Sequence, residues 1–236
     1  MTMKLMRRAY VLLSGGIDST TCLYMADKEF NGKVVGVSID YGQRHKKEIL
    51  AAKAICKKLL FDHKTLVLHD TIPTSMLTDE VSEIPSVSYS DIEGVSPTYV
   101  PFRNGFMISA LASYVQGQFN HCMDRNKADW ALYFGAHAED AANWAYPDCT
   151  PEFIGAMANA VFVGTYRTVR LYTPLQWMNK ADIIKKGTEL NVPWELTWSC
   201  YAGGTQHCGV CPTCRARRQG FIAAGVDDPT TYAAQP

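Results

Sequence analysis

Residues 13–21 read Leu-Ser-Gly-Gly-Ile-Asp-Ser-Thr-Thr and directly follow the apolar run Ala-Tyr-Val-Leu at residues 9–12. This order predicts a strand that passes through a glycine-rich turn into a helix. Gly15 and Gly16 have no Cβ atom, so the backbone can bend sharply there and approach a ligand closely. Because the first N–H groups of a helix lack partners within the helix, the turn predicts a phosphate or pyrophosphate site.

Strand-like and helix-like segments alternate along the rest of the chain. Near-continuous apolar runs predict buried parallel strands, and apolar residues at helical spacing predict amphipathic helices. The predicted strands are residues 10–13, 34–39, 64–68, 130–135 and 169–172, and the predicted helices are residues 19–30, 46–60, 105–118, 152–163 and 179–190. This alternation predicts an α/β fold, a doubly wound parallel sheet of about five strands.

Three loops of this predicted sheet follow strands and carry polar residues. Ligands of such sheets bind beyond the carboxyl ends of the strands. We therefore expect residues 14–19, 40–45 and 135–140 to lie at one edge of the sheet. A polar, proline-containing segment over residues 70–101 is too long for a simple connection, and we predict that it forms an active-site flap or lid.

Length and composition set the class of protein. A chain of 236 residues with 47% hydrophobic content is typical of one globular domain with a small appendage. We expect a nucleotide-binding domain over residues 1–190 and a metal-binding region with a terminal helix over residues 191–236. The 23 basic and 23 acidic residues balance, which argues against a large nucleic-acid surface. No run of 18 apolar residues and no convincing signal peptide occur, so we expect a cytoplasmic protein that binds no membrane and keeps its thiols reduced.

Four of the eight cysteines cluster near the end of the sequence. They are Cys200, Cys208, Cys211 and Cys214. Seven residues separate the first two, and two residues separate each later pair of neighbours. Four thiolates complete a tetrahedral Zn²⁺ site with no open position, as structural zinc sites do. An iron–sulfur cluster also fits the two short gaps in part, and four free buried cysteines are the third interpretation.

The turn at residues 13–21 resembles the PP-loop of ATP pyrophosphatases, and the chain has no Walker sequence Gly-x-x-x-x-Gly-Lys-Ser/Thr. Those enzymes cleave ATP between the α and β phosphates and activate a substrate oxygen as its adenylate. Asp18, beside a pyrophosphate, is interpreted as a Mg²⁺ contact. The resemblance implies that ATP is bound by Leu13, Ser14, Gly15, Gly16, Ile17, Asp18, Ser19, Thr20, Thr21, Cys22 and Leu23.

Further motifs make the resemblance specific. They are Asp-Tyr-Gly-Gln-Arg-His at residues 40–45, Tyr-Pro-Asp-Cys at 146–149, Thr-Pro-Leu-Gln-Trp-Met-Asn-Lys at 173–180, and the cysteine cluster. Together they resemble the 7-cyano-7-deazaguanine synthases of the QueC family. The resemblance implies a homodimeric ligase that forms carbon–nitrogen bonds. In that reaction ATP activates the carboxylate of 7-carboxy-7-deazaguanine, ammonia converts it into an amide, and a second ATP dehydrates the amide to the nitrile (preQ0).

The resemblance also assigns roles to individual residues. Asp18, Arg44, His45, Arg103 and Lys180 are the predicted catalytic residues. The three cations suit phosphates or the substrate carboxylate, with arginine offering a planar fork and lysine a point charge. A surface salt bridge or a loop anchor is the alternative for each of these residues. His45 either shuttles protons or only forms hydrogen bonds. Tyr146, Asp148 and Arg103 are the predicted contacts of the deazaguanine, whereas Cys149 is expected to be a small buried hydrophobe.

The sequence departs from the family pattern at two places. Family members usually carry Pro-Gly-Arg-Asn where residues 101–104 read Pro-Phe-Arg-Asn. Phenylalanine is not expected to adopt the backbone angles that glycine allows, and it adds bulk beside the predicted lid. The segment over residues 138–145 is also slightly longer than usual. Both departures fall at the predicted substrate edge, away from the ATP loop and the cysteine cluster.

Three other functions compete with nitrile synthesis. The first is a related ligase that couples the activated deazaguanine carboxylate to another amine, such as a protein N-terminus, and stops at the amide. The second is an RNA-modifying PP-loop enzyme, which the neutral charge and the lack of extra length disfavour. The third is a nucleotide sensor with an inactive loop, which the intact Ser14, Asp18 and Ser19 disfavour.

Overall fold

A computed structural model describes residues 6–68, 77, 78, 96, 98–120 and 128–234. Most of the segment predicted as a lid, residues 70–101, lies outside these ranges, as does Cys122. In the described part of the chain, no helix combines the length and apolar character needed to cross a bilayer.

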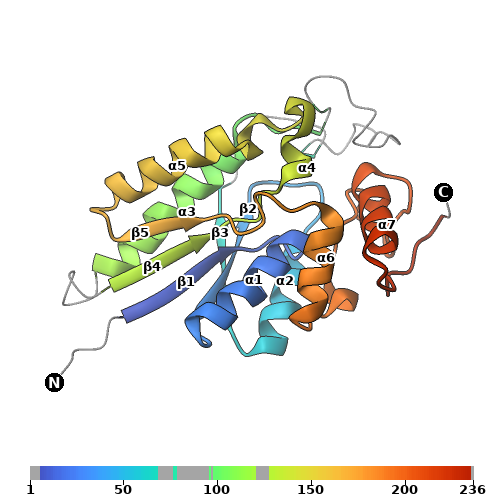
Figure 1. The fold of residues 1–236 in the computed structure, drawn as a ribbon, viewed down its shortest axis with the longest axis horizontal. Helices are drawn as coiled ribbons and strands as arrows, with labels where there is room; N and C mark the ends of the chain where they lie inside the picture. The colour runs from blue at the N-terminus through green and yellow to red at the C-terminus, as the bar shows by residue number, and fades with distance from the viewer. Residues whose placement is uncertain (1–5, 69–76, 79–95, 97, 121–127, 235–236) are drawn as a thin grey trace.

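A five-stranded parallel sheet forms the centre of the molecule (Figure 1), which confirms the predicted fold class. Its strands are β1 (Met6–Leu12), β2 (Val34–Asp40), β3 (Asp62–Val67), β4 (Ala128–Tyr133) and β5 (Val169–Tyr172). The order is β3-β2-β1-β4-β5, so the chain builds outward from β1 first to one side and then to the other. This reversal makes the carboxyl ends of β1 and β4 the expected ligand crevice.

Strand β1 starts four residues before its predicted start at residue 10. The added residues pair with β4, since Met6 is opposite Ala128 and Arg7 opposite Asp129. Pairing with a neighbour far along the chain therefore extends a strand beyond its apolar run. The turn after β1 stays attached to β2, because the N–H of Leu13 donates to the carbonyl oxygen of Val37 over 2.8 Å.

Helices cover both faces of the sheet, and each face has its own hydrophobic cluster. One cluster involves α1 (Ile17–Phe30), α2 (Lys47–Leu59) and α6 (Lys180–Glu189). The other involves α3 (Arg103–Asn120) and α5 (Pro151–Gly164). Figure 1 shows the two groups on opposite sides of the strands. Between β4 and α5 lie three short helices: α4 (Ala138–Ala141), η3 (Ala142–Trp144) and η4 (Pro147–Cys149).

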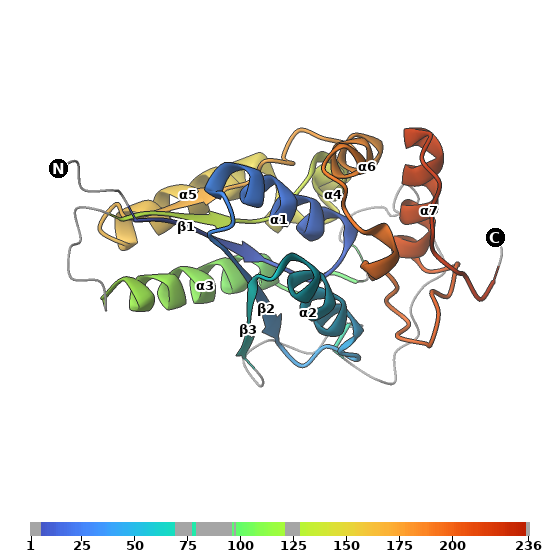
Figure 2. The same cartoon turned by 90° about the horizontal axis from the view of Figure 1, so that it is seen from below.

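The C-terminal region contains η5 (Trp194–Leu196) and the helix α7 (Pro212–Ala224). Figure 2 shows α7 beyond the carboxyl ends of the strands, beside α6. Trp194 and Phe221 belong to the hydrophobic cluster of α1, α2 and α6, and their rings meet edge to face at 5.5 Å. The region predicted as residues 191–236 thus shares a core with the sheet and covers one end of it.

Buried Arg217 joins three segments of this region. Its guanidinium donates to Thr197 Oγ1 over 2.7 Å, to the carbonyl oxygen of Trp194 over 3.1 Å, and to Asp228 Oδ1 over 3.2 Å. Asp228 in turn accepts from the hydroxyl of Tyr232 over 2.5 Å. Burial raises the pKa of Asp228, but the Arg217 charge together with the hydrogen bonds from Tyr232 and Thr230 outweighs it and holds that pKa below its usual value.

Candidate functional site

A large cavity of about 1000 Å³ lies at the carboxyl edge of the sheet. Its walls include parts of residues 14–19, 40–45 and 135–140, the three loops that the sequence places at one edge. The first turns of α2, α3 and α6 add further walls, and α7 closes the far side with Thr213, Ala216 and Gln219. The expected common edge is therefore confirmed, and α7 is an additional wall that the sequence did not predict.

The loop after β1 is shaped for phosphate. Gly15 has a φ of 83°, in the left-handed region, and a Cβ there would lie 2.7 Å from the carbonyl oxygen of Glu48. The helix α1 begins at Ile17 after the extended residue Gly16, and no side chain caps its first N–H groups. The hydroxyls of Ser14 and Ser19 lie 3.0 Å apart beside these groups. Free N–H groups and hydroxyls at a helix N-terminus are the features that bind phosphate.

The residues predicted to bind ATP divide into two groups. Those that line the cavity are Leu13, Ser14, Gly16, Ile17, Asp18 and Ser19, and Gly15 shapes the turn between them. Those that lie farther along α1, buried in its packing, are Thr20, Thr21, Cys22 and Leu23. The residues of the second group do not line the cavity; they pack α1 against the core and so hold the loop in place.

Asp18 and Lys180 form an ion pair in the cavity wall. The Lys180 ammonium lies 2.7 Å from Asp18 Oδ1, although the two residues are 162 positions apart. Lys180 is fixed at the start of α6 because Asn179 and Asp182 form a reciprocal capping box there. Burial raises the pKa of Asp18, but Lys180 and then His137 outweigh it, so the net shift is downward. Burial lowers the pKa of Lys180, but the charges of Asp18, Asp140 and Glu139 and the hydrogen bond to Asp18 together raise it by more, so both groups are charged.

His137 completes this cluster and was not predicted from the sequence. Its Nε2 lies 2.9 Å from Lys180 Nζ, 3.2 Å from Asp140 Oδ2 and 3.8 Å from Asp18 Oδ2. Its buried Nδ1 has no hydrogen-bond partner within the described residues. The signal was its place directly after β4, within the loop already expected at the ligand edge.

Arg103 faces the cavity from the first residue of α3. Its guanidinium carbon lies 5.8 Å from the ring centre of Tyr41, and its Nη2 donates to Asn104 Oδ1 over 3.3 Å. Glu48, in the first turn of α2, lines the same space. Burial raises the pKa of Glu48 to about 7, although the Arg103 charge lowers it. Sequence reasoning missed Glu48 because a charged residue in an amphipathic helix is usually on its solvated face.

Tyr146 and Asp148 belong to the segment between β4 and α5. Tyr146 lines the cavity, and Asp148 lies buried behind the start of α3. The Tyr146 hydroxyl lies 2.6 Å from Thr98 Oγ1. The Oδ2 of Asp148 accepts the backbone N–H of Asn104 over 2.9 Å and so caps the first turn of α3. Its Oδ1 has no partner among the described residues. Burial raises the pKa of Asp148, and its bond to Asn104 lowers it less.

Cys149 is buried, as expected. Its Sγ lies 3.2 Å from Asn104 Nδ2, and burial raises the pKa of its thiol well above the usual value. A protonated thiol of this kind is a poor nucleophile, so the prediction that it packs as a small hydrophobe is supported.

Arg44 and His45 both line the cavity, at the edge where the sequence places residues 40–45. The Nε2 of His45 lies 3.2 Å from the carbonyl oxygen of Tyr201, and its ring packs edge to face on Trp198 at 6.5 Å. Burial lowers the pKa of His45, which keeps the imidazole neutral near pH 7. The imidazole thus attaches the loop after β2 to the C-terminal region.

Phe102 corrects one expectation. It has a φ of 55°, in the left-handed region that glycine would occupy easily. The prediction that phenylalanine would not adopt such an angle was wrong. Its N–H donates to the Tyr99 hydroxyl over 2.9 Å, and its half-exposed ring meets Phe153 edge to face at 5.5 Å. These contacts stabilise the turn against the cost of its backbone angle.

The four clustered cysteines form a metal-binding group. All four Sγ atoms lie within 4.8 Å of one another, and those of Cys208 and Cys214 lie 3.9 Å apart. A tetrahedral site with metal–sulfur bonds of about 2.3 Å needs sulfur atoms about 3.8 Å apart. The backbone N–H of Cys208 donates to Cys200 Sγ, and that of Cys211 to Cys208 Sγ, each over 3.3 Å. N–H groups directed at sulfur stabilise thiolates, so the donor set fits a bound cation.

Trp198 connects the metal-binding group with the loop at residues 13–19, which we call the phosphate loop. The backbone N–H of Trp198 donates to the carbonyl oxygen of Gly15 over 2.8 Å. Its indole N–H donates to the carbonyl oxygen of Cys200 over 2.9 Å, and its ring packs on His207 at 4.3 Å. One residue thus contacts both the phosphate loop and a metal-binding cysteine.

Comparison with known proteins identifies the family. The family model described as "Queuosine biosynthesis protein QueC" matches residues 8–225. The 7-cyano-7-deazaguanine synthase of Thermoplasma volcanium is 43% identical, over 98% of this chain and 92% of that protein. The protein of the same name from Thermoplasma acidophilum is 39% identical, over 98% and 94%. That from Acetivibrio thermocellus is 40% identical, over 96% and 98%. The resemblance found in the sequence motifs is confirmed, and the chain belongs to the QueC family of queuosine biosynthesis proteins.

Proposed function

We propose that this chain converts 7-carboxy-7-deazaguanine and ammonia into 7-cyano-7-deazaguanine, with ATP as the energy source. The observation that carries the proposal is one cavity that joins a phosphate loop, the Asp18–Lys180 pair and the cation Arg103. The names of the relatives supply the acceptor. The activity is that of a ligase that forms a carbon–nitrogen bond.

The first task of the site is to bind ATP. The free N–H groups at the start of α1 and the hydroxyls of Ser14 and Ser19 receive phosphate oxygens. Lys180 holds its charge beside the loop, because Asp18 keeps it in place. A fixed cation stabilises the negative charge that develops as pyrophosphate leaves.

The second task is to position the acceptor. The Arg103 guanidinium can take the substrate carboxylate in a bidentate arrangement, with Arg44 as a further cation in the same cavity. Tyr146 lines the wall where the deazaguanine would lie, and Asp148 keeps Arg103 in position by capping α3. The carboxylate oxygen then attacks the α-phosphorus, and pyrophosphate leaves with the electron pair of the broken phosphorus–oxygen bond. The carboxylate oxygen, a poor leaving group by itself, can then leave as part of AMP. Holding the two reactants in this geometry provides much of the rate acceleration.

Two metal ions complete the proposal. Zn²⁺ suits the four thiols at Cys200, Cys208, Cys211 and Cys214, where it would have a structural role. Mg²⁺ would accompany ATP, and Asp18 fits as its contact because this carboxylate is anionic and lines the cavity. Bound Mg²⁺ would neutralise phosphate charge.

We further propose a homodimer in the cytoplasm that acts on small molecules and does not bind nucleic acid directly. We also propose a nucleotide-binding part at residues 1–190 and a metal-binding part at residues 191–236. The two parts share one hydrophobic cluster. Light scattering of the purified protein tests the dimer.

The decisive experiment is a product assay with 7-carboxy-7-deazaguanine, ATP and ammonium, followed by mass spectrometry. We expect the nitrile, with two AMP released for each nitrile. An amide that accumulates without nitrile would favour the ligase that stops at the amide. AMP release that needs no deazaguanine would contradict the proposed acceptor.

A further inference from the structure

Glu48 lines the cavity from the first turn of α2. On one side, its carbonyl oxygen lies 2.7 Å from the position that a Cβ on Gly15 would occupy, so the backbones of α2 and the phosphate loop are in close contact. On the other side, the charge of Arg103 acts on its carboxyl group. Glu48 therefore lines the cavity from a helix that contacts the phosphate loop, and its carboxyl group lies within range of the Arg103 charge.

Among the described residues, the carboxyl group of Glu48 is affected by the charge of Arg103 but is held by no direct contact. It forms no hydrogen bond or ion pair within the described residues, whereas the nearby Asp40 is paired with Lys46 over 2.7 Å. Burial raises the pKa of Glu48 to about 7. An unpaired carboxyl group that faces a cavity and titrates near neutral pH is suited to proton transfer.

We propose that Glu48 is the proton acceptor for the nitrogen chemistry at this site, an assignment that rests on the proposed function. An ammonium ion gives one proton to the Glu48 carboxylate, and the resulting ammonia attacks the acyl carbon of the adenylate with its lone pair. The bond from that carbon to the adenylate oxygen breaks, and AMP leaves with the electron pair. The added nitrogen releases one more proton to solvent and becomes the amide.

The same residue serves the dehydration step. The amide oxygen attacks the α-phosphorus of a second ATP, and pyrophosphate leaves with the electrons of the broken bond. The nitrogen of the adenylated amide then loses its two protons, one to Glu48 and one to solvent. The carbon–oxygen bond breaks, AMP leaves with that electron pair, and the third carbon–nitrogen bond forms.

Of the described groups beside Glu48, Arg103, Tyr41 and His45 each keep one charge state near pH 7. Arg103 is a cation throughout this range, and burial raises the pKa of Tyr41, which keeps its phenol protonated. Burial lowers the pKa of His45, so this ring is neutral. Lys47, next to Glu48 on α2, holds its ammonium 4.8 Å from the ring centre of Trp198. Asp148 belongs to the α3 side, beside Arg103.

Glu48→Gln removes the acceptor with little change in shape. We would measure single-turnover amide and nitrile formation from pH 6 to pH 9, with pyrophosphate exchange that depends on the carboxylate substrate as the measure of adenylation. In the wild type, the rates of amide and nitrile formation should rise with pH up to about pH 7, as Glu48 loses its proton, and then stay constant. The variant should be slower by about 100-fold at pH 7 and should keep rising to pH 9, because it must use free ammonia. Its exchange rate should stay within about threefold of the wild type, and Glu48→Asp should restore the levelling.

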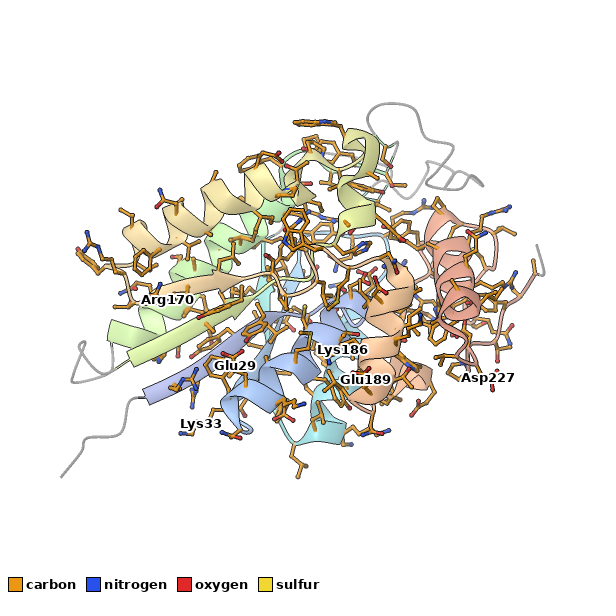
Figure 3. The ribbon with its side chains drawn as sticks, viewed as in Figure 1. Glu29, Lys33, Arg170, Lys186, Glu189 and Asp227 are labelled. Atoms are coloured by element: carbon orange, nitrogen blue, oxygen red, sulfur yellow. The ribbon has the colours of Figure 1, made fainter. Side chains whose placement is uncertain are left out.

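Glu189→Gln is the matched control. Glu189 lies at the exposed surface of α6 (Figure 3), 2.9 Å from Lys186, and should keep the wild-type profile. A wild-type pH profile in Glu48→Gln, or only a raised KM for the carboxylate, overturns the assignment. If the wild type lacks carboxylate-dependent exchange, the proposed function fails and the Glu48 role with it. Exchange without a change in the pH profile overturns the Glu48 role alone.

Discussion

At the scale of single residues, Phe102 stores local strain in a turn next to the site. Its φ of 55° is unfavourable for a side chain with a Cβ atom, at a cost of about 1–2 kcal/mol. Phe102→Gly and Phe102→Ala both lose the ring contact with Phe153, but only glycine also relieves the backbone. We expect the glycine variant to be more stable than the alanine variant by about 1 kcal/mol. Urea unfolding of the two variants measures the difference, and an alanine variant of equal or greater stability would contradict the left-handed angle.

The Asp18–Lys180 pair makes a second prediction at this scale. Lys180→Met removes the charge that lowers the Asp18 pKa, so burial then raises it. An Asp18 with a raised pKa destabilises the fold at pH 7, and this penalty is lost as the pH falls and the carboxylate is protonated. We expect the variant to lose about 1–3 kcal/mol at pH 7 and a smaller amount at pH 4, as measured by urea unfolding. Lys186→Met on the same helix tests specificity: a surface pair should contribute little, and an equal pH-dependent loss there would contradict the assignment.

These residues show what the sequence reveals about a site. Asp18 and Lys180 were each predicted from motifs, but their pairing depends on folding, because 162 positions separate them. The sequence did not predict His137 and Glu48 as site residues, because a lone histidine after a strand and a glutamate in an amphipathic helix usually have a structural role only. Only burial and neighbours distinguish them from solvated side chains.

At the scale of elements, the strands and main helices were predictable from periodicity, whereas the C-terminal helix was predicted without bounds. The reason lies in Arg217, a charged residue that sequence patterns place at the surface but that is 1% exposed. Its hydrogen bonds reach η5, residues 197–199 and Asp228. The position of α7 is thus set by a buried polar contact and by the cysteine cluster, neither of which has helical periodicity.

Arg217→Met tests this view of α7. The substitution leaves the Asp228 carboxylate without its charged partner, and breaking a buried pair in this way costs about 3–5 kcal/mol. We expect faster hydrogen exchange in α7 and residues 194–199, with little change in β1 and β4. Arg218→Met is the comparison, because Arg218 makes an exposed hydrogen bond to the carbonyl oxygen of Ala234 and stacks on the Tyr232 ring, 4.2 Å from its centre. This substitution should cost less than about 1 kcal/mol. Equal effects of the two substitutions would contradict a special role for Arg217.

At the scale of the whole molecule, the cysteine cluster and the phosphate loop are mechanically connected. Trp198 bonds to Gly15 with its backbone and to Cys200 with its indole, and α7 forms a wall of the cavity directly after Cys211. Loss of the metal would therefore loosen the loop that binds nucleotide as well as the C-terminal region. The metal-binding group therefore stabilises the phosphate loop through Trp198, without lining the nucleotide cavity itself.

Metal removal makes this connection measurable. After chelation we expect a lower Tm and faster hydrogen exchange in α7, because metal binding contributes directly to folding free energy. We also expect a Kd for a non-hydrolysable ATP analogue that rises by at least about tenfold, since the Trp198 bond to Gly15 weakens. Re-addition of Zn²⁺ should restore both properties, and Cys208→Ser should reproduce the loss without a chelator. If nucleotide affinity stays unchanged while exchange in α7 rises, Trp198 does not transmit the effect, and the two sites share only a surface.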